Sequence, residues 1–286
     1  MTAPIEYDRV VTLSPLVRRI TQQNPGLFTG PGTNTHLVGR SAVFLLDPGE
    51  DLGDGHLERI VAAVAGAPVH AIIPSHGHPD HWPLAPRLAL ALGAPIWFFG
   101  SHPGFRTDRS LSDGEVLEAG GVRLETLYTP GHCGDHLSFV MAAERAAFPG
   151  DVVMGWSTSI IAPPEGNLPE YLRSLERLLS VPDLEVLYPA HGEAITAPSD
   201  RIKELYAHRL ERTRQALEAL ANGPARIGAL VERIYADVDS ALHPAAAQSL
   251  LAHLLALESE GAIVRFGATE NTPWPMVTWR RSTPTP

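Results

Sequence analysis

The residues of this chain best suited to chemistry lie in one short run, His76-Gly77-His78-Pro79-Asp80-His81, directly after the apolar stretch 71–74. Imidazole nitrogens and carboxylate oxygens are ligands that Zn²⁺ and related first-row ions prefer. An ordinary surface loop has no use for four such groups in one turn at the end of a strand. The run therefore predicts a metal site.

Three more candidate ligands follow other apolar runs, each after a proline and a small residue. The sequence TPGH ends at His132, FPGD ends at Asp151, and YPAH ends at His191. A single histidine at the end of a strand is most often structural. Four strand ends that share one architecture indicate that the chain delivers ligands to a common centre.

The elements that must position these residues are short β-like runs that alternate with helical patterns. The predicted strands are 35–38, 42–46, 69–73, 95–99, 122–128, 137–140, 146–148 and 186–188, and the predicted helices are 57–65, 84–92 and 168–179. This alternation predicts an α/β layered fold. Glycine-containing turns at Gly39 and Gly120 predict hairpins, and hence mixed sheets.

The C-terminal part has a different pattern, with predicted helices at 199–222, 227–235 and 243–260 and a predicted hairpin of 262–267 with 275–279. Three helices and a two-stranded wing resemble a winged helix. The segment 245–260 contains no Lys or Arg, so it lacks the basic side chains that usually contact phosphates. We therefore expect a catalytic domain over 1–198 and a winged-helix-like domain over 199–286 with a structural or substrate-gating role.

Composition and charge limit the class of protein. The 286 residues are 44% hydrophobic, and the longest apolar runs fall short of the roughly 20 residues of a membrane span. No secretory signal pattern opens the chain, and its one cysteine excludes an intrachain disulfide framework, so a cytoplasmic protein is expected. The net charge of −10 falls entirely in residues 1–198, which disfavours non-specific nucleic-acid binding by the predicted catalytic domain.

The motif H-x-H-x-D-H at 76–81 and the later single-ligand motifs together closely resemble the metallo-β-lactamase-fold hydrolase superfamily. The resemblance implies an αββα sandwich of two mixed sheets with a site for two divalent ions along one edge. It implies that His76, His78 and His132 hold the first ion. The second ion would be held by Asp80, His81 and His191, and Asp151 would bridge the two. Zinc is the expected metal, with iron and manganese as open alternatives, because His and Asp ligands serve all three.

A narrower resemblance covers nearly the whole chain. The stretches 24–38 and 150–159, together with the C-terminal part, look like the lactamase-beta-like-protein-2 group, which includes an endoribonuclease and thioesterase-like relatives. True β-lactamases of this fold lack the bridging aspartate that Asp151 matches. Antibiotic hydrolysis is therefore not the expected activity.

A two-metal site of this kind implies a hydrolytic mechanism. Two ions a few Å apart share a water and lower its pKa towards neutrality, so that a bridging hydroxide is available as the nucleophile. One ion polarises the substrate oxygen, and the other stabilises the developing negative charge. Asp80 is the predicted catalytic residue, because it can hold one ion and also orient the proton of the nucleophile.

Other residues are candidates for supporting roles. Those expected to line the substrate site are Asn34, His36, Trp82, Ser157, Thr158 and Ser159. His136 either orients a metal ligand through a hydrogen bond or is a structural residue that opens the next strand, and the sequence leaves both interpretations open.

Three functions from different classes fit these patterns. A hydrolase of a small ester, thioester or lactone is favoured, because the catalytic part is acidic and the third C-terminal helix lacks basic residues. A metal-dependent endoribonuclease or phosphodiesterase is the alternative, with RNA as its partner. A metal-free scaffold is disfavoured because no ligand is missing. A membrane partner is not expected, and a homodimer through the C-terminal domain stays open.

Overall fold

The computed structural model describes residues 5–267 and 272–282. The chain forms two compact units built from interleaved segments. The first unit runs up to Thr129 and includes Asp135–Ser159 and Glu176–Arg201. The second consists of Pro130–Gly134, Ile160–Leu175 and the described residues from Ile202 onwards. Because the units interleave, the predicted domain boundary at 198/199 stays a prediction.

The first unit contains a five-stranded mixed sheet. Its strands, in spatial order, are β1 (Val10–Thr12), β2 (Val17–Thr21), β3 (Asn34–Val38), β4 (Val43–Leu46) and β5 (Val69–Ile73). Neighbours are antiparallel except β4 and β5, which are parallel and joined by helix α1 (Asp54–Val64). The parallel pair places the carboxyl ends of β4 and β5 at the same sheet edge.

A second five-stranded sheet belongs to the same unit. Its order is β12 (Val186–Leu187), β11 (Ala146–Phe148), β10 (Leu137–Met141), β9 (Val122–Tyr128) and β8 (Val116–Ala119). Here β11 and β12 are the parallel pair, and the other neighbours are antiparallel. A short parallel pair, β6 (Trp97–Phe99) with β7 (Arg109–Leu111), completes the strands of this unit.

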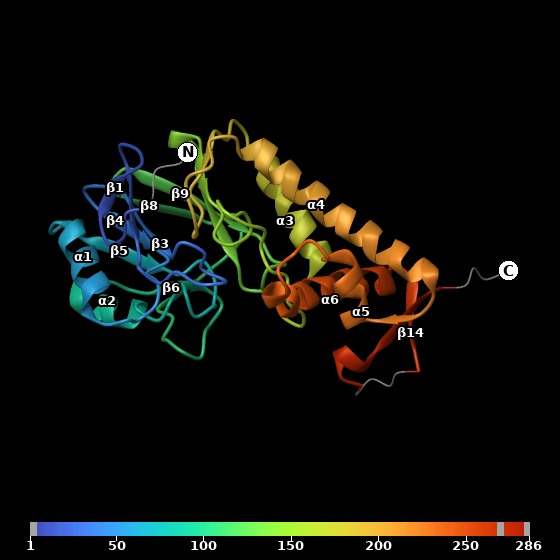
Figure 1. The fold of residues 1–286 in the computed structure, drawn as a ribbon. Helices are drawn as coiled ribbons and strands as arrows, with labels where there is room; N and C mark the ends of the chain where they lie inside the picture. The colour runs from blue at the N-terminus through green and yellow to red at the C-terminus, as the bar shows by residue number, and fades with distance from the viewer. Residues whose placement is uncertain (1–4, 268–271, 283–286) are drawn as a thin grey trace. The chain divides into compact units, whose positions relative to one another are not determined.

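Alternating side chains of the first sheet enter two different cores. In β4, Phe44 and Leu46 pack against side chains of the second sheet such as Phe139, which forms the core between the sheets. Val43 and Leu45 pack on the other face with residues of α1 and α2 (Ala85–Leu92), and Figure 1 shows these two helices beside the first sheet. Burial on both faces explains why β4 reads as a continuous apolar run.

The second unit has its own core around a small antiparallel sheet of β13 (Ala225–Arg226), β15 (Thr278–Arg281) and β14 (Ile263–Phe266). Helices α5 (Ile227–Ile234) and α6 (His243–Ser259) pack with this sheet around the fully buried Trp279. Figure 1 shows α5, α6 and β14 in this part of the chain. Helices α3 (Leu168–Leu179) and α4 (Pro198–Ala219) contribute residues to both units.

The layered fold and the winged helix predicted from the sequence are confirmed, with local differences. Strands β1, β2, β7 and β13 were not predicted, and β8 was implied only by the hairpin predicted at Gly120. The predicted final strand at 275–279 instead begins with a 3₁₀ turn, Trp274–Met276, and the strand starts at Thr278 because Pro275 cannot donate to a sheet. Among the described residues, no helix combines the length and apolar character needed to cross a membrane.

Candidate metal centre

Strand order brings six of the seven predicted metal ligands together in the first unit. His76, His78, Asp80 and His81 follow β5, Asp151 follows β11, and His191 follows β12. Because β11 and β12 are parallel neighbours, the loops that carry Asp151 and His191 leave the second sheet at the same edge. The recurring pattern of strand, proline and ligand therefore becomes a spatial cluster.

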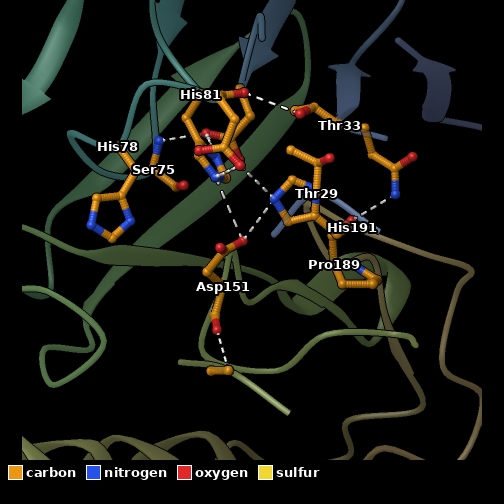
Figure 2. Close-up of polar contacts among 12 residues, drawn as sticks. Thr29, Thr33, Ser75, His78, His81, Asp151, Pro189 and His191 are labelled. Atoms are coloured by element: carbon orange, nitrogen blue, oxygen red, sulfur yellow. Dashed lines mark hydrogen bonds and ion pairs between the residues drawn. The ribbon is translucent and has the colours of Figure 1, made fainter. Parts of the chain in front are cut away.

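Two histidines and two aspartates converge within ion-pair distance. His191 Nε2 lies 3.1 Å from Asp80 Oδ2 and 3.4 Å from Asp151 Oδ1. His81 Nε2 lies 3.6 Å from the same two carboxylate atoms. Figure 2 shows Asp151 linked by dashed lines to both His81 and His191. Two further candidate ligands are also adjacent, because His76 Nε2 lies 2.9 Å from His78 Nδ1.

These positions fit divalent cations. Ligand atoms of His76, His81 and Asp151 lie within 4.8 Å of one another, and so do those of Asp80, His81 and His191. The Nε2 atoms of His81 and His191 are buried and face the carboxylate oxygens of Asp80 and Asp151. Imidazole nitrogens and carboxylate oxygens gathered at one buried point are a donor set that suits a divalent cation.

The protonation of the cluster reflects its high density of charge. Burial lowers the pKa of His81, but the neighbouring Asp80, Asp151 and Asp47 carboxylates outweigh it and raise that pKa well above its usual value. Burial also lowers the pKa of His191, but the carboxylates of Asp151 and Asp80 outweigh this effect and raise that pKa above its usual value. Without a cation, these imidazoles therefore hold protons that a metal must displace.

Outer contacts orient the imidazole rings. His191 Nδ1 lies 3.1 Å from Gly32 O, and because a carbonyl only accepts, Nδ1 carries a proton and Nε2 is the nitrogen that can bind a metal once its own proton is displaced. His76 Nδ1 is 3.0 Å from the Ser75 hydroxyl. Such contacts fix the tautomer that presents the other nitrogen to a metal.

Asp47 takes part in this site, although the sequence analysis did not select it. Its Oδ1 accepts a hydrogen bond from the Ser75 backbone N–H at 2.7 Å and lies 3.3 Å from His81 Nδ1. The residue is buried and follows β4 in the sequence Asp47-Pro48-Gly49. A carboxyl group at a strand end beside Pro and Gly was the available signal, and it matches the pattern of the predicted ligands.

His136 contacts the segment that carries Asp151. The Asp151 backbone N–H donates to His136 Nε2 at 3.1 Å, so the proton of this imidazole is on Nδ1, which lies 2.9 Å from Thr129 Oγ1. His136 is fully buried and its ring lies 5.0 Å from the ring of His76. His136 therefore holds the backbone that carries Asp151, and its role in orienting a metal ligand stays a prediction.

His132 belongs to the second compact unit, where its ring contacts the backbone. Its Nδ1 lies 2.7 Å from the carbonyl oxygen of Ile160, which places the proton on Nδ1 and the lone pair on Nε2. His191 likewise directs its Nδ1 proton at a backbone carbonyl oxygen. A role for His132 as a metal ligand stays a prediction.

Asn34 and His36 do not lie at the rim of a site, contrary to expectation. Asn34 is buried, and its amide donates to the carbonyl oxygens of Pro189 and Gly192 at 3.0 and 2.7 Å. His36 is buried beside Phe148, where burial first and the charge of Arg19 second lower its pKa to about 3. Both belong to β3, which is buried along its whole length.

The remaining substrate candidates divide into buried and partly exposed residues. Ser159 is buried, and its hydroxyl donates to the carbonyl oxygens of Asp151 and Val152, so it holds the loop of Asp151 and does not face substrate. Ser157 and Thr158 are partly exposed in that loop. Trp82 donates from Nε1 to Gly77 O at 3.1 Å and packs its ring on His102. For Trp82, Ser157 and Thr158, contact with substrate stays a prediction.

Comparison with known protein families decides the classification. Residues 28–191 match the family model described as the metallo-beta-lactamase superfamily, and residues 227–274 match the beta-lactamase associated winged helix domain. The chain belongs to the metallo-beta-lactamase superfamily. It is therefore a metal-dependent hydrolase of this superfamily that carries the associated winged helix.

Individual members of the superfamily support this assignment. An atrochrysone carboxyl ACP thioesterase from Aspergillus fumigatus is 30% identical over 80% of this chain and 76% of its own length. A beta-lactamase-like protein 2 homolog from Caenorhabditis elegans is 28% identical over 92% of this chain and 91% of its own. A crystal structure of a metallo-beta-lactamase family protein from Thermus thermophilus superimposes with a TM-score of 0.77 at 25% identity, covering 94% of this chain and all of that one.

Proposed function

We propose that this hydrolase binds two divalent ions, most simply Zn²⁺, and cleaves a small acyl thioester. In this proposal His76, His78 and His132 hold one ion, and Asp80, His81 and His191 hold the other. Asp151 contacts both. The observation that carries the proposal is the convergence of buried imidazole nitrogens on the carboxylates of Asp80 and Asp151.

The ions, when bound, supply an activated water nucleophile and polarise the carbonyl oxygen of the thioester. The protein's own residues arrange the proton transfer. The Asp80 side chain is 18% exposed, against 8% for Asp151, so Asp80 is the carboxylate that reaches the open side of the cluster. It is placed to accept the proton of the attacking water and pass it to the departing thiolate.

Two observations support an acyl thioester over other substrates. The relative from Aspergillus fumigatus, a thioesterase by name, aligns over most of both chains. The acidic charge of residues 1–198 also disfavours a polyanion, because phosphates are bound by Lys and Arg. RNA cleavage is kept as the alternative activity to be tested.

Substitution of Asp80 tests the proposed chemistry. Asp80→Asn preserves the shape of the side chain but removes its basicity, and it is expected to lower kcat by about 10²- to 10⁴-fold, the range for loss of one acid–base group. Turnover is followed by thiol release from N-acetylcysteamine thioesters, and metal content by elemental analysis. The exposed Asp237→Ala serves as the control.

The same preparations discriminate between the alternatives. Wild-type activity that is lost with a chelator and restored by Zn²⁺, Fe²⁺ or Mn²⁺ identifies the working ion. Undiminished thioester turnover by metal-loaded Asp80→Asn would refute the acid–base role of Asp80. Cleavage of single-stranded RNA by the wild type, absent in Asp80→Asn and without any thioester turnover, would replace the proposed activity with a nuclease.

A further inference from the structure

Three large apolar side chains are exposed on two loops of the first unit. Leu27 is 51% exposed, Phe28 is 60% exposed and Trp156 is 44% exposed. We name these three residues the apolar lip. A single exposed apolar residue needs no explanation, but a contiguous group of exposed apolar side chains can mark a binding site.

The loop that carries Leu27 and Phe28 has a defined conformation held by hydrogen bonds. Gly26 and Gly30 exchange two backbone hydrogen bonds, of 3.1 and 2.8 Å, which close a tight turn with Leu27 and Phe28 at its tip. The Thr29 hydroxyl donates to Asn24 O at 2.6 Å across the base of the turn. The turn therefore holds its two apolar side chains outward in a defined geometry.

Trp156 packs directly against this turn. A Cβ atom added to Gly30 would lie 2.2 Å from Trp156 Cε2, so the indole ring occupies the space where a side chain would be. Gly30 also has a φ of +55°, in the left-handed region. Arg201 anchors the loop of Trp156 by donating to Ser157 O at 2.5 Å. The indole and the turn thus form one continuous surface.

Both loops are bonded to the segments that carry the candidate metal ligands. Gly32 O accepts the hydrogen bond from His191 Nδ1, and Thr33 Oγ1 donates to Asp80 O at 3.1 Å, the contact drawn beside Thr33 in Figure 2. On the other side, Gly155 N donates to His191 O at 3.0 Å. The apolar lip is therefore connected through a few residues to His191 and Asp80.

The charge of the two loops indicates what they bind. Neither 20–35 nor 152–159 contains a Lys, Arg, Asp or Glu. Aromatic rings next to basic residues are typical of single-stranded nucleic-acid sites, where phosphates accompany stacked bases. Rings without basic residues in their own loops suit an uncharged apolar group.

We propose that the apolar lip binds the acyl chain of the substrate and makes the enzyme selective for long or aromatic acyl groups. The proposal rests on the thioesterase function proposed above. Each methylene that leaves water strengthens binding about fourfold, so chain length strongly affects binding where such a surface exists. Leu27, Phe28 and Trp156 are thereby specificity-determining residues outside the metal cluster.

The test compares acetyl, hexanoyl and decanoyl N-acetylcysteamine thioesters as substrates of the full-length metal-loaded enzyme. In the wild type, kcat/KM is expected to rise with chain length. Phe28→Ser is expected to lower the ratio of decanoyl to acetyl kcat/KM by about tenfold, mainly through KM, and Phe28→Leu to restore most of it. Leu90→Ser, which removes an 88% exposed apolar side chain from α2, is expected to keep the wild-type ratio.

Two outcomes overturn the proposal directly. One is a decanoyl to acetyl ratio in Phe28→Ser equal to that of the wild type, and the other is an equal drop in Leu90→Ser. Cleavage of single-stranded RNA by the wild type that Phe28→Ser abolishes would also overturn it, because the rings would then stack bases.

A binding measurement separates this proposal from the proposed reaction. Non-hydrolysable S-alkyl thioethers of N-acetylcysteamine are titrated into the same variants by calorimetry. Affinity that rises with alkyl length in the wild type but not in Phe28→Ser, without hydrolysis of any thioester, would support binding by the apolar lip and refute the proposed thioesterase reaction. Affinity that is independent of alkyl length refutes the lip whether or not thioesters are hydrolysed.

Discussion

Asp47 illustrates how one residue outside the ligand motifs controls the geometry of the site. It has a φ of 49°, a conformation that Asp tolerates better than most residues, and this turns its carboxylate back towards the loop after β5. There it holds both the Ser75 backbone and the His81 ring. Carboxylates that hold the outer nitrogen of a ligating histidine raise the basicity of that ligand and fix its orientation.

Two substitutions at Asp47 separate its charge from its hydrogen bond. Asp47→Asn keeps an acceptor for Ser75 N–H, so stability should change little, but metal affinity is expected to fall about 10- to 100-fold because the negative charge beside His81 is lost. Asp47→Ala additionally leaves a buried N–H without an acceptor and should cost about 1–3 kcal/mol of unfolding free energy.

Metal titration by calorimetry and urea denaturation of the metal-free proteins measure the two effects separately. If Asp47→Asn binds metal as tightly as the wild type, Asp47 has only a structural function.

At the scale of elements, the site depends on loops that strand β3 holds in place. The backbone N–H of Asn34 donates to Ala190 O at 2.7 Å, and its side-chain amide donates to two further carbonyls of the same loop. Its Oδ1 accepts from Thr21 Oγ1 at 2.8 Å on the neighbouring strand β2. The loop that presents His191 is therefore fastened to the first sheet by polar contacts of one residue.

Loss of the Asn34 amide should loosen the His191 loop. Asn34→Ala removes two donors from buried carbonyls and is expected to cost about 2–4 kcal/mol. Asn34→Asp has nearly the same shape but turns a carboxylate towards those carbonyls, so it should destabilise the fold at least as much as Asn34→Ala. Urea denaturation at a fixed metal concentration measures both, with the exposed Asn222→Ala as control. Full stability of Asn34→Asp would contradict this assignment of the amide hydrogen bonds.

At the scale of the whole molecule, buried histidines far from the metal motifs link folding to pH. His253 in α6 is fully buried with Nδ1 2.7 Å from Thr213 Oγ1, and burial first, then the nearby charge of Arg209, lower its pKa to about 3. It therefore stays neutral in the folded protein over a pH range in which the same histidine of the unfolded chain binds a proton.

The sign of this linkage is that stability falls on acidification. Below the unfolded pKa of about 6.5, one such histidine should cost about 1.4 kcal/mol per pH unit until the folded pKa near 3 is reached. Removing the titrating group in His253→Gln lowers stability at pH 7, but the difference from the wild type should narrow at pH 6 and pH 5. Urea denaturation of chelator-treated proteins measures this difference without a contribution from metal release. A difference that stays constant from pH 7 to pH 5 would exclude His253 as a source of acid sensitivity.

The type and spacing of the metal ligands, and most strands and helices, follow from the sequence because they are local properties. Four ligands within residues 76–81 must lie close together in any fold, and β4 and β9 read as strands from their own apolar patterns. Strand β2 does not, because its Arg18 and Arg19 interrupt the pattern. Arg19 is buried, and its guanidinium donates to Glu193, which lies 174 residues away in the sequence.

What only the tertiary structure decided depends on such distant contacts. The inward position of Asn34 and His36, the support of His81 by Asp47 and the packing of Trp156 on Gly30 all join segments that strand pairing brings together. A sequence shows which side chains can bind a metal or a substrate. Which of them are buried, and which nitrogen of each imidazole bears the proton, is set by neighbours that sequence separation conceals.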